Sequence, residues 1–212
     1  AVAGGDIDAA FEQAEVVVSD RIIQQRLIPN AMETRAALAS YTTATGELTL
    51  WNTTQNPHIV RFLMSLVCGL GEDKIRVVAP EVGGGFGSKL AVYPADFVTV
   101  FCSMRLGRPV KWVATRSEDF LAMHQARGKT SYLEVAANGE GKTTGLRLRH
   151  IHDLGAYAKG PEPLHSASSA MMAVGVYDIP NVELDVVNTL THKTPQGPYR
   201  GAGRPDGIFL IE

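Results

Sequence analysis

Between residues 81 and 89 the chain reads EVGGGFGSK, which places four glycines in five positions around one aromatic residue. Glycine loses more backbone entropy on folding than other residues, so a cluster this dense indicates positive φ angles or close backbone approach. A loop of this kind can direct several backbone N–H groups at one oxyanion. The stretch therefore predicts an anion site built by the backbone, with a tight turn between a strand and a helix as the alternative.

The cluster matches neither of the glycine-containing motifs that bind nucleotides. A Walker A loop ending in Lys89 needs glycine before that residue and serine or threonine after it, where Ser88 and Leu90 stand. The dinucleotide fingerprint, started at Gly83, also meets Ser88 where its last glycine belongs. Residues 136–143 nearly match a P-loop, but a strand-like alternation follows them, which favours a hairpin. A nucleotide-binding domain is kept as the rival hypothesis from another class.

The segments on either side of the cluster predict an α+β fold with mixed sheets, hairpins and packed helices. Residues 74–79 predict a strand before it, and Pro94–Leu106 predicts a helix that Gly107 ends. Other strands are expected at 15–25, 109–114 and 181–188, other helices at 57–69, 165–174 and near Asp206, and hairpins at 36–52 and 131–152. The second hairpin turns at Asn138-Gly139, the strongest short hairpin signal. Because hairpins are frequent, a mixed sheet fits better than a parallel one.

The apolar residues of two predicted helices indicate which faces turn inward. The expected buried positions are Ile59, Phe62, Leu63, Leu66 and Val67 in the first helix and Phe97, Val98, Phe101 and Leu106 in the second. Cys68 and Cys102 lie in the same two helices. Because there is no Cys-x-x-Cys pair, we expect them to be buried free thiols in a reducing compartment.

Composition and charge restrict the class of protein. The chain has 212 residues, of which 45% are hydrophobic and 20% charged, with a net charge of −2. This balance gives no electrostatic basis for binding nucleic acid or a membrane surface. The apolar runs are shorter than the roughly 20 residues of a membrane span, and no secretory signal is visible. We therefore expect a cytoplasmic protein with no membrane span and no nucleic-acid partner.

The ends of the chain indicate a piece of a longer protein. It begins at Ala1 rather than Met and stops at Glu212, within an apolar stretch. Residues 1–14 are interpreted as a linker from a preceding domain. Residues 15–212 are interpreted as a domain that is truncated at its C-terminus.

Three further features are candidate sites. Gln55 precedes a helix start, where its amide could donate to an oxyanion, although a plain loop or capping role is the alternative. Residues 195–205 form a second glycine-rich loop, in which Arg200 suits an anion and a solvated turn is the alternative. His150 and His152 share a strand face, but a half-buried pair is favoured over a metal site because no further ligand is evident.

Four segments together, residues 51–57, 81–89, 153–157 and 198–205, resemble the molybdenum hydroxylases, the xanthine dehydrogenase/aldehyde oxidase family. Their order and spacing are similar to those of the first molybdenum-cofactor-binding domain of the large subunit. The resemblance thus implies that residues 15–212 are the first part of that domain. The likeness is greatest to large chains of the carbon monoxide dehydrogenase type, in the glycine-bearing second form. It implies a molybdopterin cofactor in its cytosine dinucleotide form. It also implies an iron–sulfur small subunit and an FAD medium subunit, assembled as a dimer of heterotrimers.

The resemblance also implies roles for individual residues. Gln55 would donate from its amide to the oxo ligand of molybdenum. Gly85, Phe86 and Gly87 would lie against the metal with backbone donors, and Arg200 with Gly201 would close the other side. These residues bind the cofactor, and no side chain here binds the metal directly. The catalytic base, a glutamate, is expected beyond Glu212, so this segment alone is expected to be inactive.

The implied reaction uses water-derived oxygen to oxidise a small-molecule substrate and passes electrons to the iron–sulfur and FAD subunits. Gly201 stands where copper-using carbon monoxide dehydrogenases carry the cysteine that binds Cu(I). Leu90 stands where purine-hydroxylating relatives carry glutamate. An aldehyde or a small N-heterocycle is therefore the expected substrate. A carbon monoxide dehydrogenase large chain and a non-catalytic scaffold subunit are the alternatives.

Overall fold

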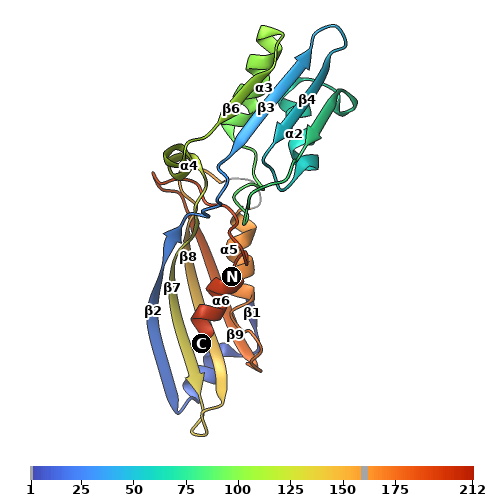
Figure 1. The fold of residues 1–212 in the computed structure, drawn as a ribbon. Helices are drawn as coiled ribbons and strands as arrows, with labels where there is room; N and C mark the ends of the chain where they lie inside the picture. Colours follow the sequence, from blue (N-terminus) through green and yellow to red (C-terminus); the bar gives the residue numbers. More distant parts are fainter. Residues whose placement is uncertain (1, 159–161) are drawn as a thin grey trace. The chain divides into compact units, whose positions relative to one another are not determined.

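The computed structural model describes residues 2–158 and 162–212. The chain divides into two compact units (Figure 1), of which unit 1 comprises Ala1–Leu27 and His124–Glu212 and unit 2 comprises Ile28–Met123. Unit 1 contains a five-stranded sheet and unit 2 a four-stranded sheet, and each combines antiparallel pairs with one parallel pair. The predicted α+β fold with mixed sheets is confirmed.

Unit 2 consists of a small sheet and the helices that pack on it. Its elements are β3 (Ala36–Thr42), β4 (Glu47–Asn52), α2 (Pro57–Cys68), the 3-10 turn η1 (Glu72–Lys74), β5 (Ile75–Val78), α3 (Pro94–Leu106), β6 (Val110–Val113) and α4 (Arg116–Ala122). The strand order is β5-β4-β3-β6, and β3 and β4 form the first predicted hairpin, with Ala37 opposite Asn52. β5 runs parallel to β4, and β6 runs antiparallel to β3.

The ends of α2 and α3 follow from their terminal residues. Pro57 and Pro94 occupy the first helical positions, where a missing N–H costs nothing. Gly69 and Gly107 end the two helices in the left-handed conformation, with φ of 70° and 61°. Both predicted helices are therefore confirmed. The glycine cluster lies between β5 and α3, in the connection that carries the candidate site.

The inward faces of α2 and α3 differ from the prediction. In α2 the buried residues are Val60 and Met64, whereas Ile59, Phe62, Leu66 and Val67 are 45–65% exposed. In α3 the buried residues are Asp96, Thr99, Val100 and Ser103, whereas Val98, Phe101 and Leu106 are exposed. Cys68 and Cys102 are free but only half-buried, and burial raises the pKa of the Cys68 thiol. Phe97 is packed against the core as predicted, but apolar spacing alone misjudged most of the other positions on both faces.

Hydrogen bonds explain why polar residues of α3 turn inward. Asp96 accepts from Asn52 Nδ2 at 2.8 Å and from the backbone N–H of Tyr93 at 2.8 Å. The Ser103 hydroxyl accepts from the N–H of Tyr41 at 3.0 Å and donates to a backbone carbonyl at 2.9 Å. These bonds join the helix to the β3–β4 hairpin and satisfy the buried polar atoms.

Unit 1 is a long twisted sheet with α5 (Glu162–Met171) and α6 (Arg204–Ile211) against one face (Figure 1). Its other elements are β1 (Val2–Gly4), α1 (Ile7–Glu12), β2 (Val16–Leu27), β7 (Ala126–Ala137), β8 (Thr143–Asp153) and β9 (Asn181–Thr189). The order is β1-β9-β8-β7-β2, and β7 and β8 form the second predicted hairpin. Leu148, Leu184 and Leu210 form the core between the sheet and α5 and α6, together with Ala170 and Ala173.

The start of the chain is ordered within unit 1. β1 pairs with β9, placing Val2 opposite Leu184, and α1 packs against β8 and β9. Of residues 1–14, interpreted above as a linker, Ala1 lies outside the described residues. The division into a linker and a cofactor-binding domain stays a prediction. In the part of the chain that the structure describes, no helix is long and apolar enough to cross a membrane.

Candidate cofactor site

Gln55 lies between β4 and α2, directly against the glycine cluster. Its Oε1 accepts hydrogen bonds from the backbone N–H groups of Gly87 at 2.9 Å and Lys89 at 3.3 Å. Because two donors converge on this atom, it must be the oxygen of the amide. Within residues 2–158 and 162–212, no acceptor is bonded to Nε2. The backbone therefore fixes the carbonyl half of Gln55 and leaves its N–H groups to donate to another molecule.

Close packing fixes the position of Gln55 as well. A Cβ atom added at Gly85 would lie 2.3 Å from Oε1 of Gln55 and 2.5 Å from its Cδ, far inside van der Waals contact. The backbone N–H of Gln55 also donates to the carbonyl of Lys89 at 2.9 Å. Glycine at position 85 is thus required so that the amide can lie on the loop.

The glycine cluster adopts a conformation that needs several left-handed residues. Gly84 has φ of 93°, Phe86 of 51° and Gly87 of 101°. A positive φ costs little at glycine, whereas at phenylalanine it is strained and persists only where the surroundings impose it. Among the described residues, the N–H groups of Gly85 and Phe86 have no hydrogen-bond acceptor. The loop therefore presents two adjacent backbone donors beside the amide of Gln55.

Lys89 argues against binding of a nucleotide by this loop. In a P-loop the lysine reaches out to the phosphates. Here Lys89 is 2% exposed, and its Nζ pairs with Glu33 Oε2 at 2.7 Å. The other glycine–lysine candidate, residues 136–143, lies at the turn of the β7–β8 hairpin as predicted. Neither lysine-bearing loop has the architecture of a phosphate-binding loop.

Arg200 and Gly201 belong to unit 1, in the loop that precedes α6. Gly201 and Gly203 have φ of 97° and 94°, and Gly203 is the N-cap of α6. Arg200 is exposed, and in the described part of the chain its guanidinium has no ion pair. The predicted site residues therefore form two groups. Gln55 and Gly85–Gly87 are together in unit 2, and Arg200 and Gly201 are adjacent in unit 1.

Gly201 has no space for a side chain. A Cβ atom at this position would lie 2.7 Å from both Cδ and Cγ of Pro205, and the φ of 97° is unfavourable for any L-residue. A cysteine in this loop would need a different backbone. The observed backbone of this loop therefore requires glycine at position 201.

A buried cluster of charged side chains contacts the loop that contains Arg200. Asp206, which is 2% exposed, pairs with Lys129 Nζ at 3.1 Å and with Arg127 Nη1 at 3.3 Å. Arg127 also donates from Nη2 to the carbonyl of Arg200 at 3.0 Å and stacks over the ring of Tyr199. The cluster was not predicted, because its members are brought together only by the β7–α6 packing.

The sequence predicts that His150 and His152 are half-buried. In the structure both are almost fully buried, next to this cluster. Burial, together with the nearby Lys129 charge, lowers the pKa of His150 to about 4 and that of His152 to about 3. Both rings are therefore neutral at neutral pH, and His150 Nδ1 is bonded to the hydroxyl of Ser131 at 2.7 Å. Over the described residues, no three His, Cys, Asp or Glu side chains are grouped to hold a metal ion.

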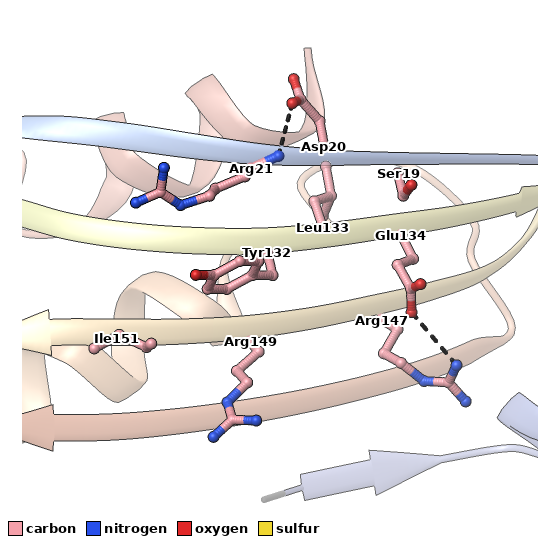
Figure 2. A pocket seen from close by; sticks show the side chains of 9 residues that line it. All are labelled: Ser19, Asp20, Arg21, Tyr132, Leu133, Glu134, Arg147, Arg149 and Ile151. Carbon is pink, nitrogen blue, oxygen red and sulfur yellow. Dashed lines mark hydrogen bonds and ion pairs between the residues drawn. The ribbon is translucent and has the colours of Figure 1, made fainter.

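A wide hollow of about 840 Å³ lies on the open face of the five-stranded sheet (Figure 2). Its charged side chains are largely paired across strands. Arg147 bonds to Glu183 at 2.7 Å and to Glu134 at 3.5 Å, and Arg149 pairs with Asp185 at 3.4 Å. None of the predicted site residues lines it.

Residues 1–212 match the family model of the molybdopterin cofactor-binding domain. The chain is 40% identical over 211 residues to the large subunit of nicotine 6-hydroxylase from Paenarthrobacter nicotinovorans, covering 98% of this chain and 26% of that one. It is 38% identical over 208 residues to the carbon monoxide dehydrogenase large chain of Hydrogenophaga pseudoflava, covering 97% and 26%. The chain therefore belongs to the molybdopterin cofactor-binding domain family.

Solved structures agree with this membership. Reconstituted carbon monoxide dehydrogenase from Oligotropha carboxidovorans superposes with a TM-score of 0.90 at 37% identity, over 100% of this chain and 27% of that one. Aldehyde oxidoreductase from Desulfovibrio gigas shares the fold, with a TM-score of 0.92 at 22% identity over 99% of this chain and 23% of that one. The predicted family resemblance is confirmed. The chain spans about a quarter of the length of the curated relatives it matches.

Proposed function

We propose that this chain forms part of the molybdenum cofactor site of a hydroxylase large subunit. The observation that carries the proposal is the fixed amide of Gln55, whose Oε1 is held by Gly87 and Lys89. The free Nε2 and the two free N–H groups of Gly85 and Phe86 form a set of neutral donors. Such donors fit a group that offers acceptor oxygens and carries its own metal, as a molybdenum–pterin cofactor does.

When bound, the cofactor would supply the redox centre that takes two electrons from the substrate. Nε2 of Gln55 would donate to an oxygen of the cofactor, and the N–H groups of Gly85 and Phe86 would donate beside it. For unit 1, we propose that Arg200, whose carbonyl accepts a hydrogen bond from Arg127, binds the cofactor as the family likeness implies. We expect the base that activates water to lie outside this sequence.

We propose an aldehyde or a small N-heterocycle as the substrate, hydroxylated with oxygen from water. The name of the nicotine 6-hydroxylase relative supports an N-heterocycle. The lack of space at Gly201 speaks against a copper-binding cysteine in this loop. A carbon monoxide dehydrogenase large chain is the second candidate, and the similarity to the large chain of Hydrogenophaga pseudoflava supports it.

We also propose the finer features that the family likeness suggests. They are the cytosine dinucleotide form of the cofactor, an iron–sulfur subunit and an FAD subunit as electron acceptors, and a dimer of heterotrimers. The large-subunit and large-chain names of the relatives support a multi-subunit enzyme. The free Cys68 and Cys102 support a reducing compartment, and we propose the cytoplasm.

The test is the production of the complete large subunit with its partner subunits. Molybdenum per subunit is measured, and aldehydes, N-heterocycles and carbon monoxide are offered with an artificial electron acceptor in water labelled with oxygen-18. The proposal predicts bound molybdenum and labelled oxygen in the product of an aldehyde or N-heterocycle. Turnover of carbon monoxide alone would favour the second candidate. A complex without molybdenum would favour the scaffold alternative and refute the proposal.

A further inference from the structure

Glu33 contacts both ends of the glycine cluster with one carboxylate oxygen. Its Oε2 accepts from the backbone N–H of Gly83 at 2.8 Å and from Nζ of Lys89 at 2.7 Å. The backbone N–H of Glu33 donates in return to the carbonyl of Gly83 at 3.1 Å. Gly83 is the first glycine of the cluster, and Lys89 is the residue that ends it. A side chain from a distant part of unit 2 thus joins the two ends of the loop.

Lys89 requires the Glu33 carboxylate as its partner because its ammonium group is buried. The side chain of Lys89 is 1% exposed, whereas that of Glu33 is 35% exposed. An ammonium group this deeply buried is strongly destabilising without an acidic partner, so the position of Lys89 is determined by Glu33. Gly83 also accommodates Glu33, because a Cβ atom there would lie 2.6 Å from Cβ of Glu33.

The residues between these two ends carry the donors of the candidate site. Gly85 and Phe86 present free N–H groups, and Gly87 holds the amide oxygen of Gln55. The second bond to that oxygen comes from the backbone N–H of Lys89 itself. Three of the four residues from Gly84 to Gly87 have a positive φ. A loop of this kind would adopt several conformations unless its ends were fixed.

We propose that Glu33 is a positioning residue for the glycine cluster. By fixing Gly83 and Lys89, it holds the left-handed conformation of the loop and, through Gly87 and Lys89, the orientation of the Gln55 amide. What these donors bind rests on the proposed function. The positioning itself is a property of unit 2 and is measurable in the 212-residue chain without cofactor.

Amide hydrogen exchange tests this role in three variants and a control. Glu33→Gln keeps the size of the side chain and an acceptor for Gly83 but removes the charge that pairs with Lys89. Lys89→Met removes the ammonium and leaves an apolar chain of similar length, and the double variant removes both. Glu72→Gln is the control, because it breaks the Glu72–Arg61 pair in the same unit, where both side chains are 42% exposed.

The N–H of Gly87, which is bonded to Gln55, is the reporter. We expect its exchange to accelerate about tenfold or more in Glu33→Gln, beyond any change in the central β3–β4 hairpin, and to stay unchanged in Glu72→Gln. The double variant should unfold less readily than Glu33→Gln, because no unpaired charge stays buried. A folded Glu33→Gln protein with unaltered exchange at Gly87 would overturn the proposal.

If Glu33→Gln does not fold, Lys89→Met gives the decisive comparison, since it leaves no buried charge. It should still accelerate exchange at Gly87, and unchanged exchange there would also overturn the proposal. The assembled enzyme separates this inference from the proposed function. Faster exchange at Gly87 in a complex that never binds molybdenum would leave Glu33 as a positioning residue and refute the cofactor assignment.

Discussion

Oε1 of Gln55 accepts the backbone N–H of Gly87 at 2.9 Å, so the amide is oriented by the loop beside which it would bind a ligand. The bond fixes which end of the side chain is the donor. A glutamine free to rotate could offer either its oxygen or its nitrogen, whereas this one can offer only N–H groups. The predictions below follow from this arrangement and from the contacts that support it.

Replacement of Gly85 by alanine should disturb Gln55 directly. The added Cβ would lie 2.3 Å from Oε1 of Gln55, and the φ of Gly85 is not in the left-handed region, so the effect is purely steric. We expect the methyl group to displace the exposed Gln55 side chain and to break the two hydrogen bonds to its Oε1, at a cost of about 1 kcal/mol in the free energy of unfolding. Urea unfolding of Gly85→Ala measures it. Gly4→Ala is the control, because nothing lies within 4 Å of a Cβ at that position. Equal stability of the two variants would contradict the described contact.

A cysteine introduced at position 201 should destabilise the protein rather than complete a copper site. Its side chain would meet Pro205 at 2.7 Å, and its backbone would have to keep a φ of 97°. The left-handed conformation alone costs about 1–2 kcal/mol for a residue with a Cβ. Urea unfolding of Gly201→Cys and of Gly201→Cys/Pro205→Ala measures both contributions. The second substitution should recover part of the loss, and a fully stable single variant would show that the loop tolerates cysteine.

The Asp206 cluster should be far more sensitive than a surface ion pair. Asp206→Asn leaves the charges of Lys129 and Arg127 without their shared carboxylate in a buried site. We expect a loss of about 3–5 kcal/mol, since removal of one partner leaves uncompensated buried charge. Asp185→Asn, which breaks the exposed pair with Arg149, should cost less than about 1 kcal/mol. Similar losses in thermal or urea unfolding would refute the buried cluster.

Stability should fall in mild acid because of His150 and His152. Their pKa values are lowered to about 4 and about 3 in the folded protein, against an ordinary value of 6.5. Below pH 6.5 the unfolded chain therefore binds protons that the folded chain does not, and stability decreases as the pH falls toward 4. Each histidine contributes up to about 1.4 kcal/mol per pH unit in this window.

Urea unfolding at pH 7, 6 and 5 measures this dependence, in a range where most carboxyl groups stay ionised. His150→Asn should reduce the slope to about half by removing one of the two protons taken up on unfolding. A free energy of unfolding that is the same at pH 5 and pH 7 would contradict the burial of the two rings.

Local signals in the sequence were enough to predict most elements. The pairs Pro57 with Gly69 and Pro94 with Gly107 mark both ends of α2 and α3, and Asn138-Gly139 marks the second hairpin. α4 also has a local signal that the sequence analysis missed, since Thr115 and Glu118 form a capping box. The buried face of α3 had no such signal, because Asp96 is turned inward by a bond to Asn52, 44 residues away.

For the same reason, the candidate site could be predicted only in part from the sequence. The position of Gln55 before a helix start made it a candidate donor, and the glycine cluster indicated backbone donors by itself. The roles of Gln55 and Phe86 beside the metal came only from the likeness to family motifs. Glu33 was not found, because its function in the loop depends on contacts with Gly83 and Lys89 that are 50 and 56 residues away in sequence. Lys89, considered first as a phosphate ligand, is understood only when this partner is known.

The most direct test of the central claim is the substitution of Gln55 by glutamate in the complete, assembled enzyme. Glutamate keeps an acceptor for the N–H groups of Gly87 and Lys89 but cannot donate. Molybdenum content and turnover are measured against wild type and against Gln25→Glu, an exposed control on β2. Loss of a hydrogen bond of about 1.5–3 kcal/mol predicts a fall in turnover of about ten- to a hundredfold for Gln55→Glu, and none for Gln25→Glu. Unchanged molybdenum content together with unchanged turnover in Gln55→Glu would contradict the account.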